Sequence, residues 1–282
     1  MQTQQSQANP PSEFPHLAVA VKHDGTHVGL LYRVTEAPPK FLHLGWHHEL
    51  YDDDTIRNGY AWAACSGFDD HEGRDMASWL RKIYQANIGR IPYGFNYWPG
   101  ACFDEDGLFT PSREGLGLTC ATFVMALFEA QSYPIANVAS WKARADDQEW
   151  FKKVVHELRT HSNASAEHIQ AQIDGMGRAV RFRPLEVVAC ASSYEEDSIG
   201  FEQAVSLAAE FVEDLTTNWN GTPPPYELLA RVAGTEPKTA SADDAEQVSP
   251  KDGKNIAKVA QAPARKDVAD AAPGKEQSTP HK

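Results

Sequence analysis

Short apolar blocks separated by polar turns dominate residues 16–64. The run 16–34, HLAVAVKHDGTHVGLLYRV, has two apolar segments broken by His-Asp-Gly, a turn signal, and this pattern predicts a hairpin of two strands. The segments 41–46 (FLHLGW) and 60–64 (YAWAA) are again short and apolar, and they predict two more strands. The pattern therefore predicts a small antiparallel sheet in the N-terminal part of the fold.

A helical period follows the strands. Apolar side chains recur at helical spacing in residues 75–86 (DMASWLRKIYQA), and Gly89 is placed to end that helix. Residues 91–117 are rich in glycine, proline and aromatic residues, which predicts an irregular loop with an aromatic lining. Thr119 then offers an N-cap to the apolar segment 120–131 (CATFVMALFEAQ), which predicts a buried helix. Further helices are predicted at residues 146–159, 165–174, 201–219 and 226–232.

Both ends of the chain differ in composition from the part between them. Residues 235–282 contain no aromatic residue and few large aliphatic ones, so this tail cannot bury enough apolar surface to offset its ordering entropy. Residues 1–13 form a polar, glutamine-rich arm. We therefore expect one folded domain over residues 14–234, between a disordered arm and a disordered tail.

The charge is concentrated in the folded part. The tail carries eight basic and eight acidic side chains, so the formal net charge of −13 lies on the rest of the chain. Such an acidic surface repels phosphate backbones and argues against nucleic acid as a partner. A protein partner could instead bind the acidic surface or the tail. We find no stretch of about 18 apolar residues and no signal peptide, and we expect a cytoplasmic protein without a membrane span.

Among the four cysteines, Cys120 lies at a position that favours a thiolate anion. Cys65, Cys102, Cys120 and Cys190 contain no C-x-x-C pair, so reduced thiols are expected rather than a zinc knuckle or a redox motif. Cys120 begins the predicted apolar helix, where unpaired backbone N–H groups and the helix dipole favour an anion. We therefore expect its pKa to lie below the ~8.5 of a free thiol and the residue to be a nucleophile. The alternative is an inert cysteine of the core.

Three short motifs carry a family resemblance. The segment T-H-V-G-L-L-Y at 26–32, the L-H of FLHLG and the later C-A-T-F-V at 120–124 resemble the circularly permuted branch of the NlpC-type papain-like superfamily. That branch includes lecithin:retinol acyltransferase-like proteins and bacterial hydrolases, and it places the histidine strand before the cysteine helix, as His27 and Cys120 are ordered here. The resemblance covers about residues 16–131. It implies an α+β, papain-like fold in which a small antiparallel sheet packs on the cysteine helix, with extra C-terminal helices.

The resemblance also implies a chemistry. By motif, Cys120 aligns with the nucleophile, His27 with the base that forms a thiolate–imidazolium pair, and His43 with the polar residue that holds the imidazole in its working tautomer. The implied activity is hydrolysis of an amide in a peptide or peptidoglycan-like substrate through a thioester, without a cofactor or a metal. Acyl transfer to or from a lipid is the nearest variant, and a non-catalytic binding module on the same scaffold is the alternative from another class.

Two histidines, His43 and His47, are candidates for the residue that lies beside His27 on the next strand. The motif favours His43, and we adopt it. A regular hairpin centred near Ala37 would instead place His27 opposite His47. Either His43 or His47 could also be a strand histidine without a function.

Cys65 is the rival nucleophile, because C-S-G-F resembles the unpermuted form of the same superfamily. The residues that follow it, DDHEGRD, cannot form an apolar buried helix, and no H-x-G strand follows downstream. We therefore expect Cys65 to mark the end of a strand.

Two other groups of residues have both a functional and a structural interpretation. One group could bind a divalent metal, although neighbouring aspartates are typical of a solvated turn; it consists of His43, His47, His48, Asp52, Asp53 and Asp54. The other group could line a substrate groove, although aromatic clusters more often serve packing; it consists of Tyr93, Phe95, Tyr97, Trp98 and Phe103.

Overall fold

The computed structural model of the chain describes residues 3–5, 15–35, 38–54, 56, 59–100, 102–111 and 115–218. All of them belong to one compact unit within residues 1–238. The predicted tail and the predicted helix at 226–232 lie outside the described residues, as does most of the predicted arm. The arm residues Thr3–Gln5 form a short strand, whereas the sequence pattern predicted no structure there.

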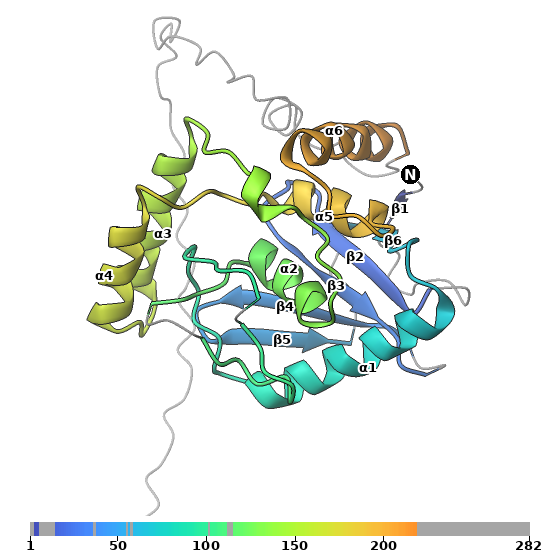
Figure 1. Cartoon of the computed structure of the whole chain (residues 1–282), viewed down its shortest axis with the longest axis horizontal. Coiled ribbons are helices and arrows are strands. Elements are labelled where there is room, and N and C mark those ends of the chain that lie inside the picture. The colour runs from blue at the N-terminus through green and yellow to red at the C-terminus, as the bar shows by residue number, and fades with distance from the viewer. Residues whose placement is uncertain are drawn as a thin grey trace, which may run out of the picture. The chain divides into compact units, whose positions relative to one another are not determined.

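The described residues fold as α+β, as predicted. In the described part of the chain, six strands form one antiparallel sheet in the order β1-β6-β2-β3-β4-β5 (Figure 1). The strands are β1 (Thr3–Gln5), β2 (Leu17–Lys22), β3 (Val28–Tyr32), β4 (Lys40–Trp46), β5 (Glu49–Asp53) and β6 (Tyr60–Ala64). The predicted hairpin is β2–β3, and the two further predicted strands are β4 and β6. β5 was not predicted, because its sequence ELYDD has little apolar character.

Side chains of the sheet alternate between two buried clusters, as the period of a strand requires. Val28, Leu30 and Leu42 belong to the large core shared with the helices. Leu31 and Phe41, one position along, belong to a smaller cluster with tyrosine and tryptophan of β6. The two faces of the sheet are therefore chemically distinct, and a strand residue can be assigned to a face by its position.

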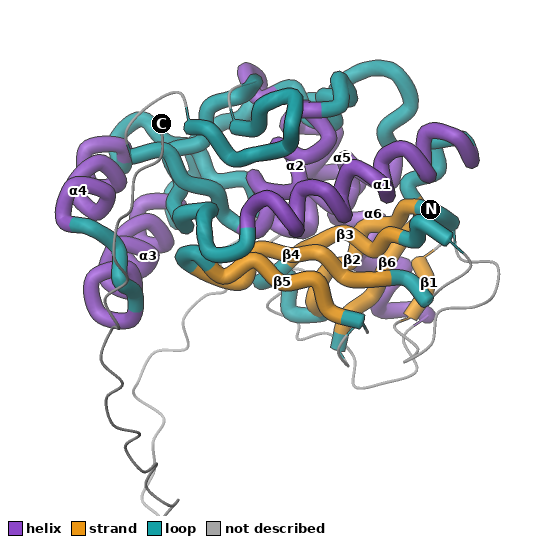
Figure 2. Tube along the Cα trace, turned by 90° about the horizontal axis from the view of Figure 1, so that it is seen from below, coloured by secondary structure: helices purple, strands orange, loops and turns teal. Residues whose placement is uncertain are grey.

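The described residues also form six α-helices. They are α1 (Asp70–Asn87), α2 (Cys120–Ala130), α3 (Asp147–His161), α4 (Ala166–Gly175), α5 (Pro184–Ser193) and α6 (Phe201–Asn218). Figure 2 shows α1 and α2 on the same side of the sheet, and α5 joins them in the large core. α5 was not predicted, since its mostly apolar sequence, PLEVVACASS, lacks the polar face of an amphipathic helix. None of the described helices has the length and hydrophobicity that a membrane crossing needs.

The helix that carries Cys120 has the predicted start. The Thr119 side chain accepts a hydrogen bond from the N–H of Thr122 at 3.1 Å, and the Thr122 hydroxyl accepts one from the N–H of Thr119 at 2.8 Å. This reciprocal capping box is a strong start signal for a helix. Residues 120–128 of α2 are all buried, because the helix packs on β3 and β4. The capping box and this packing together fix the position of the thiol.

The segment 91–117 is irregular where it is described, as predicted. It is attached to the start of α2 by two backbone hydrogen bonds, from Leu118 N to Pro92 O at 3.0 Å and from Gly94 N to Leu118 O at 3.2 Å. These bonds place Tyr93 beside the N-terminal end of α2.

Candidate active site

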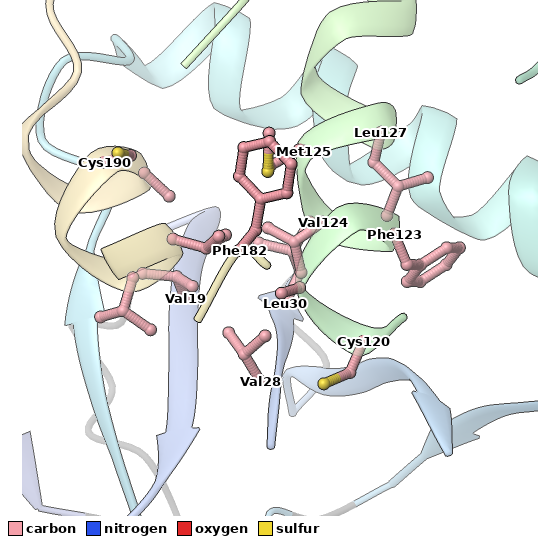
Figure 3. Packing of buried hydrophobic residues seen from close by; sticks show 14 of the residues in the cluster. Val19, Val28, Leu30, Cys120, Phe123, Val124, Met125, Leu127, Phe182 and Cys190 are labelled. Carbon is pink, nitrogen blue, oxygen red and sulfur yellow. The ribbon is translucent and has the colours of Figure 1, made fainter. Parts of the chain in front are cut away.

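The Cys120 sulfur lies at the start of α2, against the N-terminal end of β3 (Figure 3). The backbone N–H of Val28 donates a hydrogen bond to this sulfur, and the N–H groups of Ala121 and of Cys120 itself also point to it. The Val28 N–H can do so because the pairing between β3 and β4 begins only at Leu30. The end of the sheet thus supplies a donor that would otherwise be used in the strand ladder.

Burial dominates the acidity of the thiol. Cys120 is only 5 % exposed, and loss of hydration raises the pKa of its thiol to about 11, although the N–H donors and the Arg181 charge act in the opposite direction. The prediction of a pKa below that of a free thiol is therefore wrong. Because the group is a neutral thiol at pH 7, any nucleophilic role requires a base that removes its proton.

His27 directly precedes Val28, the residue whose N–H contacts the sulfur. Its Nε2 atom lies 2.9 Å from Nδ1 of His43, and the two rings meet edge to face with centroids 4.9 Å apart. The Tyr60 ring stands at right angles to the His27 ring, at 6.3 Å. The structure therefore brings together His27 and His43, and it brings the Cys120 sulfur to the residue adjoining His27.

His43 is held on three sides. It is 6 % exposed and stacks on Phe41 at 4.6 Å. Gly29 on the neighbouring strand makes room for it, because a Cβ atom added there would lie 2.6 Å from the Cβ of His43. Its Nε2 atom lies 3.4 Å from Oδ2 of Asp53, on β5. Phe41 and His43 lie on the face of the sheet that carries the smaller cluster, whereas α2 covers the opposite face. The Cys120 sulfur and the two histidines therefore reach the N-terminal end of β3 from opposite faces of the sheet.

The chain His27–His43–Asp53 sets the tautomers of both rings. An ionised carboxylate only accepts, so Asp53 takes the Nε2–H of His43, and Nδ1 of His43 becomes an acceptor. His27 must then donate from Nε2 to His43. The unprotonated nitrogen of neutral His27 is consequently Nδ1. This tautomer assignment follows from the hydrogen-bond partners and starts from the carboxylate of Asp53. The sequence had suggested Asp53 only as a metal ligand or as part of a solvated turn.

Tyr93 is a second residue at this site, and the sequence suggested it only as one of five aromatic residues that could line a substrate groove. The N–H of Cys120 donates to its hydroxyl, and burial, followed by the proximity of the Cys120 charge, raises the Tyr93 pKa well above its usual value. The ring packs on Trp46 with centroids 4.4 Å apart. The hydroxyl is therefore a protonated, fixed hydrogen-bond donor beside the thiol. Its sequence signal, one aromatic residue among several before the cysteine helix, does not distinguish it from its neighbours.

His47 has a different place from the one that simple register suggested. Its Nδ1 accepts a hydrogen bond from the Tyr93 N–H at 3.2 Å, while His168 Nε2 lies 2.9 Å from the Tyr93 carbonyl oxygen. Burial, together with His48 and His168, lowers the pKa of His47 to about 4. His47 therefore stays neutral and holds the backbone of Tyr93, and the neighbour of His27 is His43.

The suggested metal-binding group does not converge. Asp52 accepts from the Tyr32 hydroxyl at 2.9 Å and pairs with Lys40 at 3.2 Å, and Asp54 pairs with the same lysine at 3.0 Å. Within the described part of the chain, no three His, Cys, Asp or Glu side chains are arranged to hold a metal ion.

The other cysteines are buried packing residues. Cys65 immediately follows β6, as predicted, and burial raises its pKa far above that of a free thiol. Cys190 on α5 has a pKa raised by burial in the same way. Cys102 is buried as well, and its thiol donates to the carbonyl oxygen of Trp98 at 3.7 Å. Cys120 is thus distinguished from Cys65 and Cys190 by the N–H groups and the cation that act on its sulfur.

Two cavities among the described residues border segments that adjoin Tyr93 and His27 in the chain. A cavity of about 700 Å³ is lined in part by Phe95, Tyr97 and Trp98, so three of the five predicted aromatic residues border a hollow. Phe103 instead packs against other phenylalanines of the core. A cavity of about 460 Å³ adjoins the β2–β3 turn at Thr26, next to His27.

Comparison with known proteins gives no relative. No family model matches the chain, and neither a curated protein nor a solved structure matches it. The structure itself defines an α+β protein in which the sulfur of a helix-start cysteine contacts the backbone N–H of Val28, the residue after the first member of a His27–His43–Asp53 chain.

Proposed function

We propose that the protein is a cysteine-dependent hydrolase of the permuted papain-like type, which cleaves an amide bond in a peptide or peptidoglycan-like substrate through a thioester at Cys120. The observation that carries the proposal is the 2.9 Å contact between His27 Nε2 and His43 Nδ1, one residue from the N–H that faces the Cys120 sulfur. Such a chain of a nucleophile, a base and an orienting group is the common arrangement for covalent catalysis.

Activation begins from a neutral thiol. Nδ1 of His27 removes the thiol proton as the sulfur attacks the substrate carbonyl, and His43 with Asp53 stabilises the resulting imidazolium. This order of events agrees with a Cys120 pKa of about 11, because a thiol that buried is not ionised in advance at neutral pH. It replaces the preformed thiolate–imidazolium pair that the resemblance implied.

The sulfur–carbon bond forms while the carbonyl π electrons move onto oxygen. The Tyr93 hydroxyl, whose oxygen accepts a hydrogen bond from the Cys120 N–H, supplies a hydrogen bond to that oxyanion. Collapse breaks the carbon–nitrogen bond, and His27 gives its proton to the leaving amine. Water, deprotonated by His27, then cleaves the thioester and releases a carboxylic acid and the thiol.

A non-catalytic binding module is the second candidate, and one observation favours it. A thiol that is 5 % exposed and has a raised pKa is typical of a core cysteine. A lipid acyltransferase or thioesterase would use the same residues, with a different acyl donor or acceptor.

Cys120→Ala, compared with Cys102→Ala as a matched control, tests the proposal. The purified full chain is incubated with libraries of acylated peptides, peptidoglycan fragments and acyl lipids, and products are identified by mass spectrometry. We expect amide hydrolysis by the wild type and by Cys102→Ala, and a loss of at least about 10³-fold in Cys120→Ala. Hydrolysis that survives in Cys120→Ala would refute the role of the thiol. Binding of a library member without turnover by any variant would favour the binding module.

A further inference from the structure

The cavity of about 460 Å³ beside the candidate site has two different walls. One wall is the β2–β3 turn, residues 24–26, which leads directly into His27. The other wall comes from α3 and from the segment 181–186 that leads into α5. A ligand in this cavity therefore lies against the residue that precedes the proposed base.

Most of the carboxylates at this cavity are already paired. Asp24 accepts from Lys22 at 2.7 Å, and Glu186 forms an ion pair with Arg144. Asp146 receives two hydrogen bonds from one nitrogen of Arg183, at 2.7 and 2.8 Å.

Of the two arginines that line the cavity, Arg181 has the longer carboxylate contact. Its guanidinium lies 3.8 Å from the same Asp146 oxygen, which is beyond hydrogen-bond distance, and this oxygen is shared with Arg183. The exposed side chains of Glu149 and Lys153, of opposite charge, also border the cavity. The cavity thus presents a guanidinium that has capacity for another anion.

The guanidinium of Arg181 is also held in place. Its central carbon lies 4.5 Å from the centroid of the Trp150 ring, a cation–π contact, and the side chain is 21 % exposed. Its charge lowers the pKa of both Cys120 and Tyr93, so it acts on the two groups that the proposed reaction uses. An arginine held on an aromatic face loses little freedom when it binds a planar anion.

We propose that Arg181 binds a carboxylate of the substrate, so that the preferred amide is one that carries a free carboxylate close to the scissile bond. This inference rests on the proposed hydrolase function and names its substrate class, an acidic peptide-like amide. A planar carboxylate matches the fork of the guanidinium. Because the folded part of the chain is strongly acidic, such a local cation also gives an anionic substrate a specific place to bind.

Binding is measured separately from catalysis, with Cys120→Ala as the background. An acetylated tetrapeptide with a free C-terminal carboxylate is compared with the same peptide as its C-terminal amide, by isothermal titration calorimetry or by NMR titration. We expect the acid to bind at least ~10-fold more tightly than the amide, a preference that Arg181→Gln abolishes and Arg181→Lys keeps in part. Arg178→Gln, at an exposed arginine of the other cavity, is the matched control and should keep the full preference. Thermal melts of both Arg181 variants check that they fold.

The outcomes distinguish a failure of the proposed carboxylate site at Arg181 from a failure of the proposed hydrolase function. Equal binding of acid and amide, or a preference that survives in Arg181→Gln, overturns the carboxylate site even if the wild type hydrolyses amides. An Arg181-dependent preference without hydrolysis by the wild type supports the site and refutes the proposed function. Displacement of the acidic peptide by inorganic phosphate at an equal or lower concentration overturns the carboxylate assignment in favour of a phosphate ligand.

Discussion

His43 connects His27 to Asp53: one of its ring nitrogens lies 2.9 Å from Nε2 of His27, and the other lies 3.4 Å from a carboxylate oxygen of Asp53. Three neighbouring strand segments contribute one residue each. This arrangement orients His27 independently of Cys120. In the proposed reaction the sheet therefore orients the proton acceptor, His27, and α2 holds the proton donor, Cys120.

Asp53→Asn should reduce kcat/KM by about 10- to 100-fold, because the amide carries no charge to stabilise the His27–His43 imidazolium. The apparent pKa of the acid limb of the pH–rate profile should move to lower pH, since loss of the carboxylate favours the neutral pair. The measurement is kcat/KM against pH on the amide substrate found by library screening. Asp54→Asn is the control, because Asp54 pairs with Lys40 at the surface. An unchanged profile in Asp53→Asn would remove the carboxylate from the chain.

Alkylation of Cys120 should be slow at pH 7 and should accelerate as the pH rises toward about 11, because burial raises the pKa of this thiol to that value. Arg181→Gln should slow the reaction at each pH below 11, since the Arg181 charge favours the thiolate. Iodoacetamide labelling followed by peptide mass spectrometry gives the rate at each cysteine. Cys65 and Cys190, whose pKa values burial raises further, serve as internal references. A labelling rate that levels off below pH 8 would show that the thiolate is formed in advance.

Tyr93→Phe should lower kcat by about 10²- to 10³-fold with little change in KM, because it removes one donor to the oxyanion and leaves the packing of the ring on Trp46. Steady-state kinetics on the amide substrate separate the two constants. Tyr133→Phe, at a tyrosine whose hydroxyl contacts Glu72, is the control for loss of a hydroxyl. A change confined to KM would assign Tyr93 to substrate binding.

The protein should lose stability as the pH falls from about 6.5 to about 4, in part through His47. Its pKa of about 4 in the folded protein lies below the value of 6.5 expected in the unfolded chain. The unfolded chain therefore binds a proton first over this range, and the loss attributable to His47 amounts to roughly 3 kcal/mol once both states are protonated. Urea unfolding at several pH values measures the free energy of unfolding.

His47→Gln provides the comparison, because its amide oxygen can accept from the Tyr93 N–H without titrating. This variant should lose less stability than the wild type between pH 6.5 and 4. His156→Gln, at an exposed histidine of α3, should show the wild-type slope. If wild type and His47→Gln have the same slope, His47 is not the titrating group.

Several features could be predicted because their cause is local. The strand pattern of residues 17–32 and the capping of α2 by Thr119 depend on neighbours within a few positions, and the structure confirms both. β5 and α5 could not be predicted in this way. β5 is an edge strand with exposed Glu49 and Tyr51, and α5 is buried all round, so neither has the amphipathic period that identifies an element.

The sequence by itself determined the α+β class and the start of the cysteine helix, and the family resemblance added the hypothesis that His27, His43 and Cys120 act together. Only the tertiary structure decided that His43 rather than His47 adjoins His27, that Asp53 and Tyr93 join the group, and that the thiol is neutral at pH 7. The physical reason is that strand register, the approach of a distant loop and the loss of hydration on burial depend on contacts between segments far apart in the chain.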